Sequence, residues 1–351
     1  MPYCNRLKVT QTAQERTVFF VKILVTGGAG YIGGTVAGLL AEKGHKAVIF
    51  DNLSHGRQEF LPAGVPFVEG EVADRIGLEK IFIDAKEQGA PFDGVLHFAA
   101  LIEAGESMVR PEIFFRNNTA STLTLLEAML AHGPRKLVFS STAAVYGEPE
   151  SVPIREDARL QPTNAYGESK LMVERMLSWF QRCHGLRYAS LRYFNAAGGN
   201  RDRGENHNPE THLIPLVLQV ALGQREAIST YGTDYPTKDG TCVRDYIHID
   251  DLATAHLLAL DGLAEHEQLI CNLGSGSGFS VREIIDIARR VTGRDIPAIE
   301  APRRAGDPAV LVASSEKIKR VLGWNPQHSD VEAIVRSAWE WHKSHPKGYE
   351  G

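Results

Sequence analysis

Short apolar runs alternate with longer amphipathic segments from residue 22 to residue 193. Continuous apolar runs such as KLVF and GVLHF are typical of strands in a parallel sheet that helices cover on both faces. The pattern predicts strands at Lys22–Thr26, Lys46–Asp51, Pro66–Glu69, Gly94–Phe98, Lys136–Ser140 and Tyr188–Tyr193. It predicts helices at Tyr31–Lys43, Ile76–Gln88, Glu112–Ala131, Ala165–Cys183 and, roughly, His212–Leu222.

This alternation predicts an α/β fold with a Rossmann-type doubly wound parallel sheet. Ligands of such sheets bind outside the carboxyl ends of the strands. We expect residues 21–195 to form this domain, with a strand and helix contribution from later segments. We expect residues 196–351 to form mainly a smaller C-terminal substrate-binding lobe. Residues 1–20 are polar and lack the features of a signal peptide, so we expect a disordered extension there.

The first predicted strand ends in a glycine-rich turn. Gly27, Gly30 and Gly33 have the spacing G-x-x-G-x-x-G. The first two glycines let the backbone approach a phosphate, and the third lets the following helix pack closely on the strand. The start of that helix offers free N–H groups and a positive dipole potential to a pyrophosphate. Glycine turns also join strands to helices without any ligand, but the surrounding strand, helix and second strand favour a dinucleotide site.

Asp51 ends the second strand, where an acid can accept hydrogen bonds from the adenosine ribose hydroxyls. A carboxylate there repels a 2′-phosphate, so it favours NAD over NADP. Asp51 and Asn52 also form a common turn-forming pair, so a structural role stays open. After the third strand, Glu71 either bonds an adenine amino group or is a solvated loop acid. His97, near the end of the fourth strand, is expected to be a core histidine.

The candidate chemistry lies after the fifth strand. Thr142 follows this strand, and a hydroxyl there can hold an oxygen of the substrate. Tyr166 and Lys170 are four residues apart at the start of a helix, so they share one face. A nearby ammonium lowers the pKa of a phenol, and the pair can then act as a general base on an alcohol. YxxxK alone is common by chance, but the upstream glycine turn favours a catalytic role.

Composition narrows the class of protein. The chain has 351 residues, is 43% hydrophobic and carries a net charge of −5, which disfavours a nucleic-acid-binding protein. Its four cysteines are scattered without a CxxC pair, so we expect no disulfide framework, no metal site and a reducing, cytoplasmic location. No apolar run reaches the roughly 18 residues of a membrane span.

Together these motifs resemble the extended short-chain dehydrogenase/reductase superfamily and, within it, the UDP-glucose 4-epimerase family. The resemblance runs from Val21 to Tyr349. Its more specific segments are GGAGYIG (27–33), DNLSHG (51–56), RYFNAAG (192–198), HLIPLV (212–217), YGTDYPTKDGTCVRDYIHIDDLA (231–253), CNLGSGSGFSV (271–281) and APRRAGDPA (301–309).

The resemblance assigns site residues by position. For NAD it implies the glycine turn and the segments after the strands, that is Gly27, Gly30, Tyr31, Ile32, Gly33, Asp51, Asn52, Glu71, Val72, Phe98, Ala99, Ala100, Asn117, Ser140, Tyr166, Lys170 and Tyr193. For a UDP-hexose it implies Thr142, Tyr166, Asn195, His212, Leu213, Tyr231, Arg244, Arg304 and Asp307. The two arginines match diphosphate-binding positions, a role that suits a planar guanidinium, although both could also belong to surface ion pairs.

The implied reaction interconverts UDP-glucose and UDP-galactose at C4 through a transient 4-keto sugar, with tightly bound NAD. Tyr166 is the base, Lys170 holds the cofactor ribose, and Thr142 bonds the reacting oxygen. A dehydratase would need an acid pair at Ala143 and Ala144, which argues against elimination. A net dehydrogenase or reductase stays open, whereas a non-enzymatic NAD sensor is disfavoured because Tyr166 and Lys170 are both present.

Two departures from the family bear on substrate and cofactor contacts. Ile102 stands where some relatives carry a lysine near the NAD pyrophosphate, so that contact is absent or supplied elsewhere. Leu311 stands at a position that helps to set the size of the sugar pocket, so action on N-acetylhexosamines stays open. By analogy, helices Glu112–Ala131 and Ala165–Cys183 resemble those that pair in family dimers, and we expect a homodimer.

Overall fold

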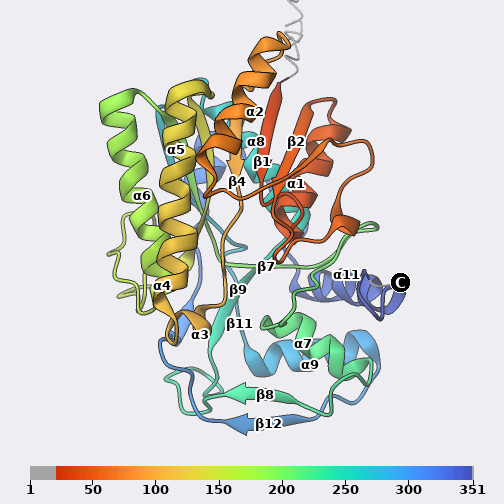
Figure 1. Cartoon of the computed structure of the whole chain (residues 1–351). Helices are drawn as coiled ribbons and strands as arrows, with labels where there is room; N and C mark the ends of the chain where they lie inside the picture. Colours follow the sequence, from red (N-terminus) through yellow and green to blue (C-terminus); the bar gives the residue numbers. More distant parts are fainter. Residues whose placement is uncertain (1–20, 350–351) are drawn as a thin grey trace, which may run out of the picture.

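The computed structural model describes residues 21–349, so the expected extension at residues 1–20 lies outside the described part. Its main sheet has the strand order β10-β6-β5-β4-β1-β2-β3, and every pairing is parallel (Figure 1). The strands are β1 (Lys22–Thr26), β2 (Lys46–Asp51), β3 (Phe67–Glu69), β4 (Gly94–His97), β5 (Lys136–Thr142), β6 (Arg187–Tyr193) and β10 (Gln268–Leu273). The strand order reverses between β1 and β4, where doubly wound sheets bind their ligands.

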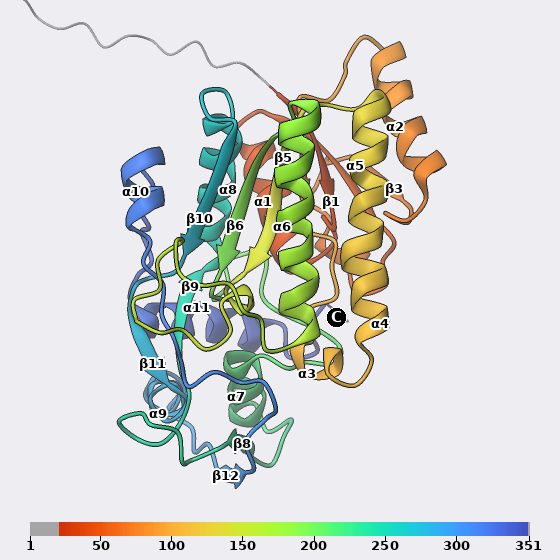
Figure 2. The ribbon, with the colours of Figure 1, turned by 90° about the vertical axis from the view of Figure 1, so that its left-hand side faces the viewer.

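Helices cover both faces of this sheet (Figure 2). One face carries α1 (Tyr31–Glu42) and α8 (Ile249–Gly262), and the other carries α2 (Arg75–Glu87), α5 (Ser121–His132) and α6 (Ala165–His184). Each face has its own cluster of buried apolar side chains, which explains why the central strands are apolar on both sides. The predicted doubly wound fold is confirmed.

The structure identifies the later strand that joins the predicted sheet, and it divides one predicted helix. That strand is β10, which pairs with β6 at the sheet edge. The segment predicted as one helix from Glu112 to Ala131 consists of α4 (Pro111–Phe114), a π-helical turn η2 (Phe115–Ala120) and α5. In that π turn, the Asn118 amide donates to the Leu101 carbonyl at 2.9 Å and accepts from the Leu101 N–H at 2.8 Å. The turn thereby ties this helical segment to the loop after β4.

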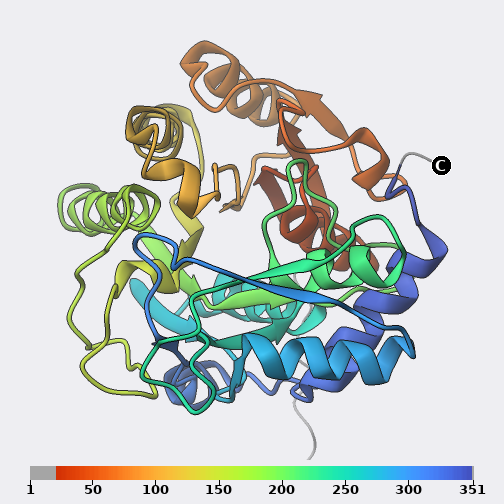
Figure 3. The ribbon, with the colours of Figure 1, turned by 90° about the horizontal axis from the view of Figure 1, so that it is seen from below.

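The remaining elements lie beneath the carboxyl edge of the sheet (Figures 1 and 3). The strand β9 (Val243–His248) pairs with β7 (Asn195–Ala197), β11 (Gly278–Ser280) and β13 (Val310–Leu311). A separate pair joins β8 (Ile228–Tyr231) to β12 (Ala298–Ala301). Helices α7 (Leu213–Ala221), α9 (Val281–Thr292) and α11 (Val331–Ser344) share an apolar core of their own.

Four short helices complete the described part: α3 (Ala104–Ser107), α10 (Glu316–Leu322), and the 3-10 turns η1 (Gln58–Phe60) and η3 (Ala143–Val145). Between residues 21 and 349, no helix has both the length and the apolar character needed to cross a bilayer. The three cysteines of this part, Cys183, Cys242 and Cys271, are free thiols.

Candidate active site

The carboxyl ends of the sheet strands open onto two adjoining cavities. The first has a volume of about 350 Å³ and is lined by the glycine turn and by residues that follow β2, β3, β4, β5 and β6. The second has a volume of about 1200 Å³ and is lined by α7, β9 and the loop before β13. Asn117, Asn195 and His212 belong to the lining of both. The two cavities therefore form one continuous site with room for two ligands.

The glycine turn packs so closely that side chains have no space. Gly27 has φ +74°, and a Cβ on it would lie 2.8 Å from the backbone of Phe98 and Ala99. A Cβ on Gly33 would lie 2.9 Å from the carbonyl carbon of Gly27. A Cβ on Gly30, by contrast, would meet protein only at the Gly27 oxygen, 3.4 Å away. Gly30 thus leaves the cavity floor bare at the start of α1, and the turn fits a bound pyrophosphate.

Asp51 is a buried carboxylate at the end of β2. It accepts hydrogen bonds from the N–H groups of Ala29 at 3.0 Å and Leu53 at 2.9 Å, so its carboxylate is fixed beside the glycine turn. Burial raises the pKa of Asp51, although these backbone bonds oppose the shift. Leu53 has φ 58°, a rare conformation for a residue with a branched side chain. Strain of this kind is concentrated at functional sites.

Asn52 and Glu71 meet across the mouth of the first cavity. The Asn52 amide donates to both oxygens of the Glu71 carboxylate at 3.0 Å. Glu71 is exposed and lines the cavity, so the structure leaves it available to an adenine amino group.

The predicted base lies against the predicted hydroxyl. The side chains of Tyr166 and Thr142 both line the first cavity and lie close enough for Thr142 to affect the charge state of Tyr166. Lys170 lies one turn further along α6, is buried, and donates to the Ser140 carbonyl at 2.8 Å. Lys170 belongs to neither cavity lining, so the structure places it behind the tyrosine, over the Phe139 ring at 4.9 Å.

Burial changes the expected protonation of this pair. It raises the pKa of Tyr166 to about 12, while the hydrogen bond with Thr142 acts in the opposite direction. It also lowers the pKa of Lys170 to about 7. The predicted lowering of the tyrosine pKa by the lysine is therefore wrong for the polypeptide alone. Desolvation is the largest cause of both shifts, and it disfavours the charged form of each group.

A buried network holds this helix against the sheet, and sequence reasoning missed it. Glu174 follows Lys170 by one turn and accepts from the Ser141 hydroxyl at 2.6 Å. Arg192 donates to the same carboxylate at 2.6 and 3.0 Å, and both charged side chains are at most 5% exposed. Ser141 and Arg192 adjoin Thr142 and Tyr193, so the pair fixes α6 directly behind the reacting groups. The i, i+4, i+8 spacing of Tyr166, Lys170 and Glu174 was the available signal.

The other positions predicted to meet the cofactor also border the first cavity. This lining includes Tyr31, Ile32, Val72, Phe98, Ala99, Ala100, Ser140 and Tyr193. The Tyr193 hydroxyl hydrogen-bonds His256. His97 is buried between Thr26 and Thr122, with contacts of 2.6 and 2.8 Å, and burial lowers its pKa to about 3. The prediction of a core histidine is confirmed.

The second cavity gathers the residues predicted to meet a nucleotide sugar. Its lining includes Asn195, His212, Leu213, Tyr231, Arg244, Arg304 and Asp307. The Arg304 guanidinium lies 3.9 Å from the centroid of the Tyr231 ring, and the two form a cationic and aromatic wall. Arg244 donates to the Pro308 carbonyl at 2.8 Å and lies 3.7 Å from Asp307. The site therefore offers two guanidinium groups to an anionic ligand.

Ile102 and Leu311, the two residues that depart from the family pattern, have different surroundings. Ile102 lines both cavities. Leu311 is buried in a cluster with Tyr146 and Phe194, and it belongs to neither lining.

Comparisons with known proteins agree with this geometry. The profile of the NAD dependent epimerase/dehydratase family matches residues 23–274. A UDP-glucose 4-epimerase of Streptomyces lividans is 57% identical over 94% of this chain and 98% of its own length. The crystal structure of the Brucella ovis UDP-glucose 4-epimerase in complex with NAD has a TM-score of 0.86 and 43% identity, covering 91% of this chain and 98% of that one. The Bifidobacterium longum UDP-glucose 4-epimerase in complex with NAD⁺ and UDP has a TM-score of 0.88 and 35% identity, covering 93% and 99%.

Proposed function

The chain belongs to the NAD dependent epimerase/dehydratase family, and we infer that it is an NAD-dependent UDP-glucose 4-epimerase. It interconverts UDP-glucose and UDP-galactose by inverting the configuration at C4 of the hexose. The observation that carries this conclusion is the placement of Tyr166 and Thr142 together in the first cavity, which holds the glycine turn and adjoins a second cavity lined by Arg244 and Arg304.

The chain's own residues hold both ligands and move one proton. The glycine turn and the Asp51 carboxylate seat the dinucleotide, and the carboxylate favours unphosphorylated ribose. The Tyr166 phenol oxygen takes the proton from the C4 hydroxyl of the sugar. The Thr142 hydroxyl holds the C4 oxygen in place. NAD held by these residues would supply a reversible hydride acceptor for C4, and its oxidised ring would add a positive charge that favours the Tyr166 phenolate.

Anchoring at the diphosphate lets the keto sugar turn over. Arg244 and Arg304 hold the charged end of the ligand, and the hexose reaches toward Tyr166 and Thr142 in the first cavity. A 4-keto sugar that rotates about its link to the diphosphate presents its opposite face to the same hydride. The reaction produces no net oxidation, so NAD stays bound through the cycle.

The residues after β5 disfavour a dehydratase. Elimination of water needs a positioned acid beside the threonine. Ala143 and Ala144 occupy these positions, and the Ala144 N–H is bonded to the Thr142 hydroxyl oxygen at 3.1 Å. No acid–base group is therefore available at the two residues that follow Thr142.

Conversion without added cofactor tests the proposal. Purified protein is incubated with UDP-galactose and no NAD, and the products are separated by ion-exchange chromatography. We expect UDP-glucose to form. A keto or dehydrated sugar in its place would overturn the epimerase assignment. The same assay with UDP-N-acetylglucosamine measures whether the pocket also accepts N-acetylhexosamines.

We also propose that the protein is a homodimer in the cytoplasm. The outer sides of α5 and α6 expose the apolar side chains of Leu123, Met172 and Trp179, the last at 62%. Burial of these side chains in a helix pairing gives the dimer an apolar driving force. The free thiols Cys183, Cys242 and Cys271 suit a reducing compartment. Light scattering coupled to size-exclusion chromatography gives the molar mass, and a monomer would contradict the dimer.

A further inference from the structure

Two histidines and two glutamates face one another in the segment that leads into α7. His212 Nδ1 lies 3.0 Å from Glu205 Oε1 and 2.9 Å from Glu210 Oε1. His207 Nδ1 lies 3.5 Å from Glu205 Oε1 and 3.9 Å from Glu210 Oε2. One donor atom from each of the four side chains lies within 4.8 Å of all the others. We name these four residues the His–Glu cluster.

The spacing of these donors matches a four-coordinate cation. Zn²⁺ binds imidazole nitrogen and carboxylate oxygen at about 2.0–2.2 Å, which puts neighbouring ligands of a tetrahedral site about 3.3–3.6 Å apart. The four distances of the His–Glu cluster, from 2.9 to 3.9 Å, lie on both sides of this value. Small side-chain movements would make them equal.

Hydrogen bonds within residues 21–349 leave one nitrogen of the His–Glu cluster unsatisfied, although Glu210 accepts from the N–H groups of Thr211 and His212 at 2.8 Å each. His207 Nδ1 is buried and has no hydrogen-bond partner among residues 21–349. His212 Nδ1 can carry only one proton, yet two carboxylate oxygens lie within 3.0 Å of it. Glu205 is 6% exposed and pairs with His212, and a metal ion can stabilise a buried carboxylate in place of such a pairing. Two carboxylates and two neutral imidazoles balance the charge of one divalent cation.

We propose that the His–Glu cluster binds one divalent cation of the zinc class, through His207, His212, Glu205 and Glu210. Mixed imidazole and carboxylate donors suit Zn²⁺ better than Mg²⁺ or Ca²⁺, which prefer oxygen ligands alone. This site departs from the sequence analysis, which sought metal ligands among the cysteines and expected none. Two of its ligands, Glu205 and His212, line both cavities, so the proposed ion lies at the edge of the nucleotide-sugar site.

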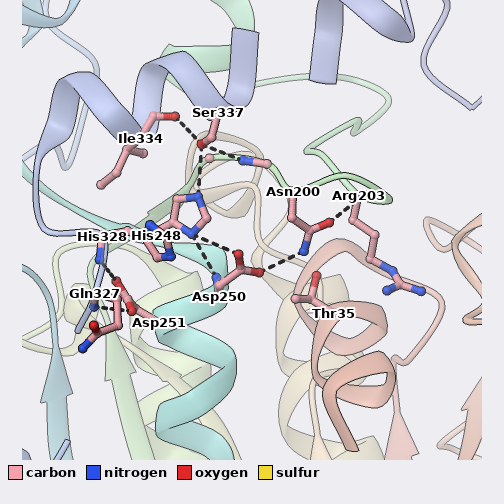
Figure 4. A network of polar contacts seen from close by, with 12 residues as sticks. Thr35, Asn200, Arg203, His248, Asp250, Asp251, Gln327, His328, Ile334 and Ser337 are labelled. Atoms are coloured by element: carbon pink, nitrogen blue, oxygen red, sulfur yellow. Dashed lines mark hydrogen bonds and ion pairs between the residues drawn. The ribbon is translucent and has the colours of Figure 1, made fainter. Parts of the chain in front are cut away.

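A second group in the same protein provides a matched comparison (Figure 4). His248, Asp250 and His328 also lie close enough to share an ion. However, His248 Nε2 contacts the Ser337 hydroxyl at 3.0 Å, and His248 Nδ1 accepts from the Asp250 N–H at 3.2 Å. Both ring nitrogens of His248 are therefore engaged, whereas the His207 Nδ1 is not. We expect this second group to bind no metal.

Metal binding to the full-length, NAD-loaded protein tests the proposal. Protein stripped with a chelator and dialysed is titrated with ZnCl₂ against a chromophoric competitor, and bound zinc is counted by mass spectrometry. We expect one high-affinity Zn²⁺ per chain. Glu205→Gln and His207→Asn should each weaken the affinity at least ten-fold, because even loss of a residue that supports a ligand costs about ten- to hundred-fold. His328→Asn and Cys183→Ser should leave it unchanged.

Equal zinc affinity in Glu205→Gln, His207→Asn and the unaltered protein would overturn the proposal, as would the absence of a high-affinity site. Retained NAD and an unchanged circular dichroism spectrum identify variants that fold. If the variants do not fold, the cobalt spectrum of the unaltered protein still tests the site. Bound Co²⁺ should show the strong visible absorption of four-coordinate cobalt and lose it when Zn²⁺ is added. Only the weak spectrum of six-coordinate cobalt would contradict the site.

Discussion

Two alanine substitutions in the glycine turn should separate folding from cofactor binding. In Gly33→Ala, the new methyl group lies 2.9 Å from the Gly27 carbonyl carbon and 3.0 Å from the Gly28 Cα. Ordinary carbon contacts are about 3.5–4.0 Å, so α1 and the turn must separate by about 0.5–1 Å. Overpacking of this kind lowers the free energy of unfolding by up to about 3 kcal/mol. The higher helix propensity of alanine offsets up to about 1 kcal/mol of this loss. We expect a net loss of about 2 kcal/mol.

Gly30→Ala is the matched control for this strain. Its methyl group meets only the Gly27 oxygen at the ordinary distance of 3.4 Å and otherwise enters the cavity. Gly30 is the N-cap of α1, and alanine is a weaker N-cap than glycine. This difference lowers the free energy of unfolding by less than about 1 kcal/mol. The methyl group occupies space where the backbone meets the pyrophosphate, so NAD affinity should fall at least ten-fold.

Urea unfolding of NAD-free protein measures the stability of both variants, and NAD retained after gel filtration measures binding. We expect Gly33→Ala to unfold at clearly lower urea than Gly30→Ala, and both to lose NAD. Full NAD retention in Gly30→Ala would refute the placement of the pyrophosphate over the turn. Unaltered stability of Gly33→Ala would refute the close contact between α1 and the turn.

Three further substitutions test the reacting and supporting residues. Tyr166→Phe should lower kcat at least a hundred-fold and leave NAD bound, as absorbance of the denatured supernatant shows; near-normal turnover would remove Tyr166 as the base. Arg304→Ala should raise KM for UDP-galactose about ten- to hundred-fold. The control is Arg303→Ala, because Arg303 pairs with Asp234 outside the cavities. This control should change KM less than about two-fold. Glu174→Gln should cost about 3–5 kcal/mol in urea unfolding because it leaves the buried Arg192 unpaired. The partly exposed control Glu168→Gln should cost less than about 1 kcal/mol, and equal losses would contradict the account of the buried pair.

Sequence patterns predicted the local elements of the fold well because each depends on its own residues. β1 and β2 begin and end where the apolar runs do. The pairing of β10 with β6 could not be predicted in this way, since about eighty residues separate them and nothing local specifies the contact. The π turn Phe115–Ala120 was hidden for a similar reason. Asn118 in this turn bonds Leu101 in the loop after β4, a contact that the continuous apolar pattern of the segment does not indicate.

The candidate site followed from motif spacing, whereas its electrostatics did not. Tyr166, Thr142 and the glycine turn come together as their positions after parallel strands predict. The direction of the Tyr166 pKa shift depends on burial, which the spacing of Tyr166 and Lys170 does not reveal. The His–Glu cluster was also invisible, because its four residues are ordinary polar residues of a loop until the fold turns them toward one another.

Return of the same hydride to the same sugar is the central claim, and an isotope label tests it directly. UDP-galactose with deuterium at C4 is incubated with the purified protein without added NAD, and the UDP-glucose formed is examined by mass spectrometry and NMR. If resident NAD accepts the label and returns it to the opposite face, the product carries deuterium at C4 and no free reduced cofactor accumulates. UDP-glucose that carries hydrogen from the solvent at C4 would contradict the account.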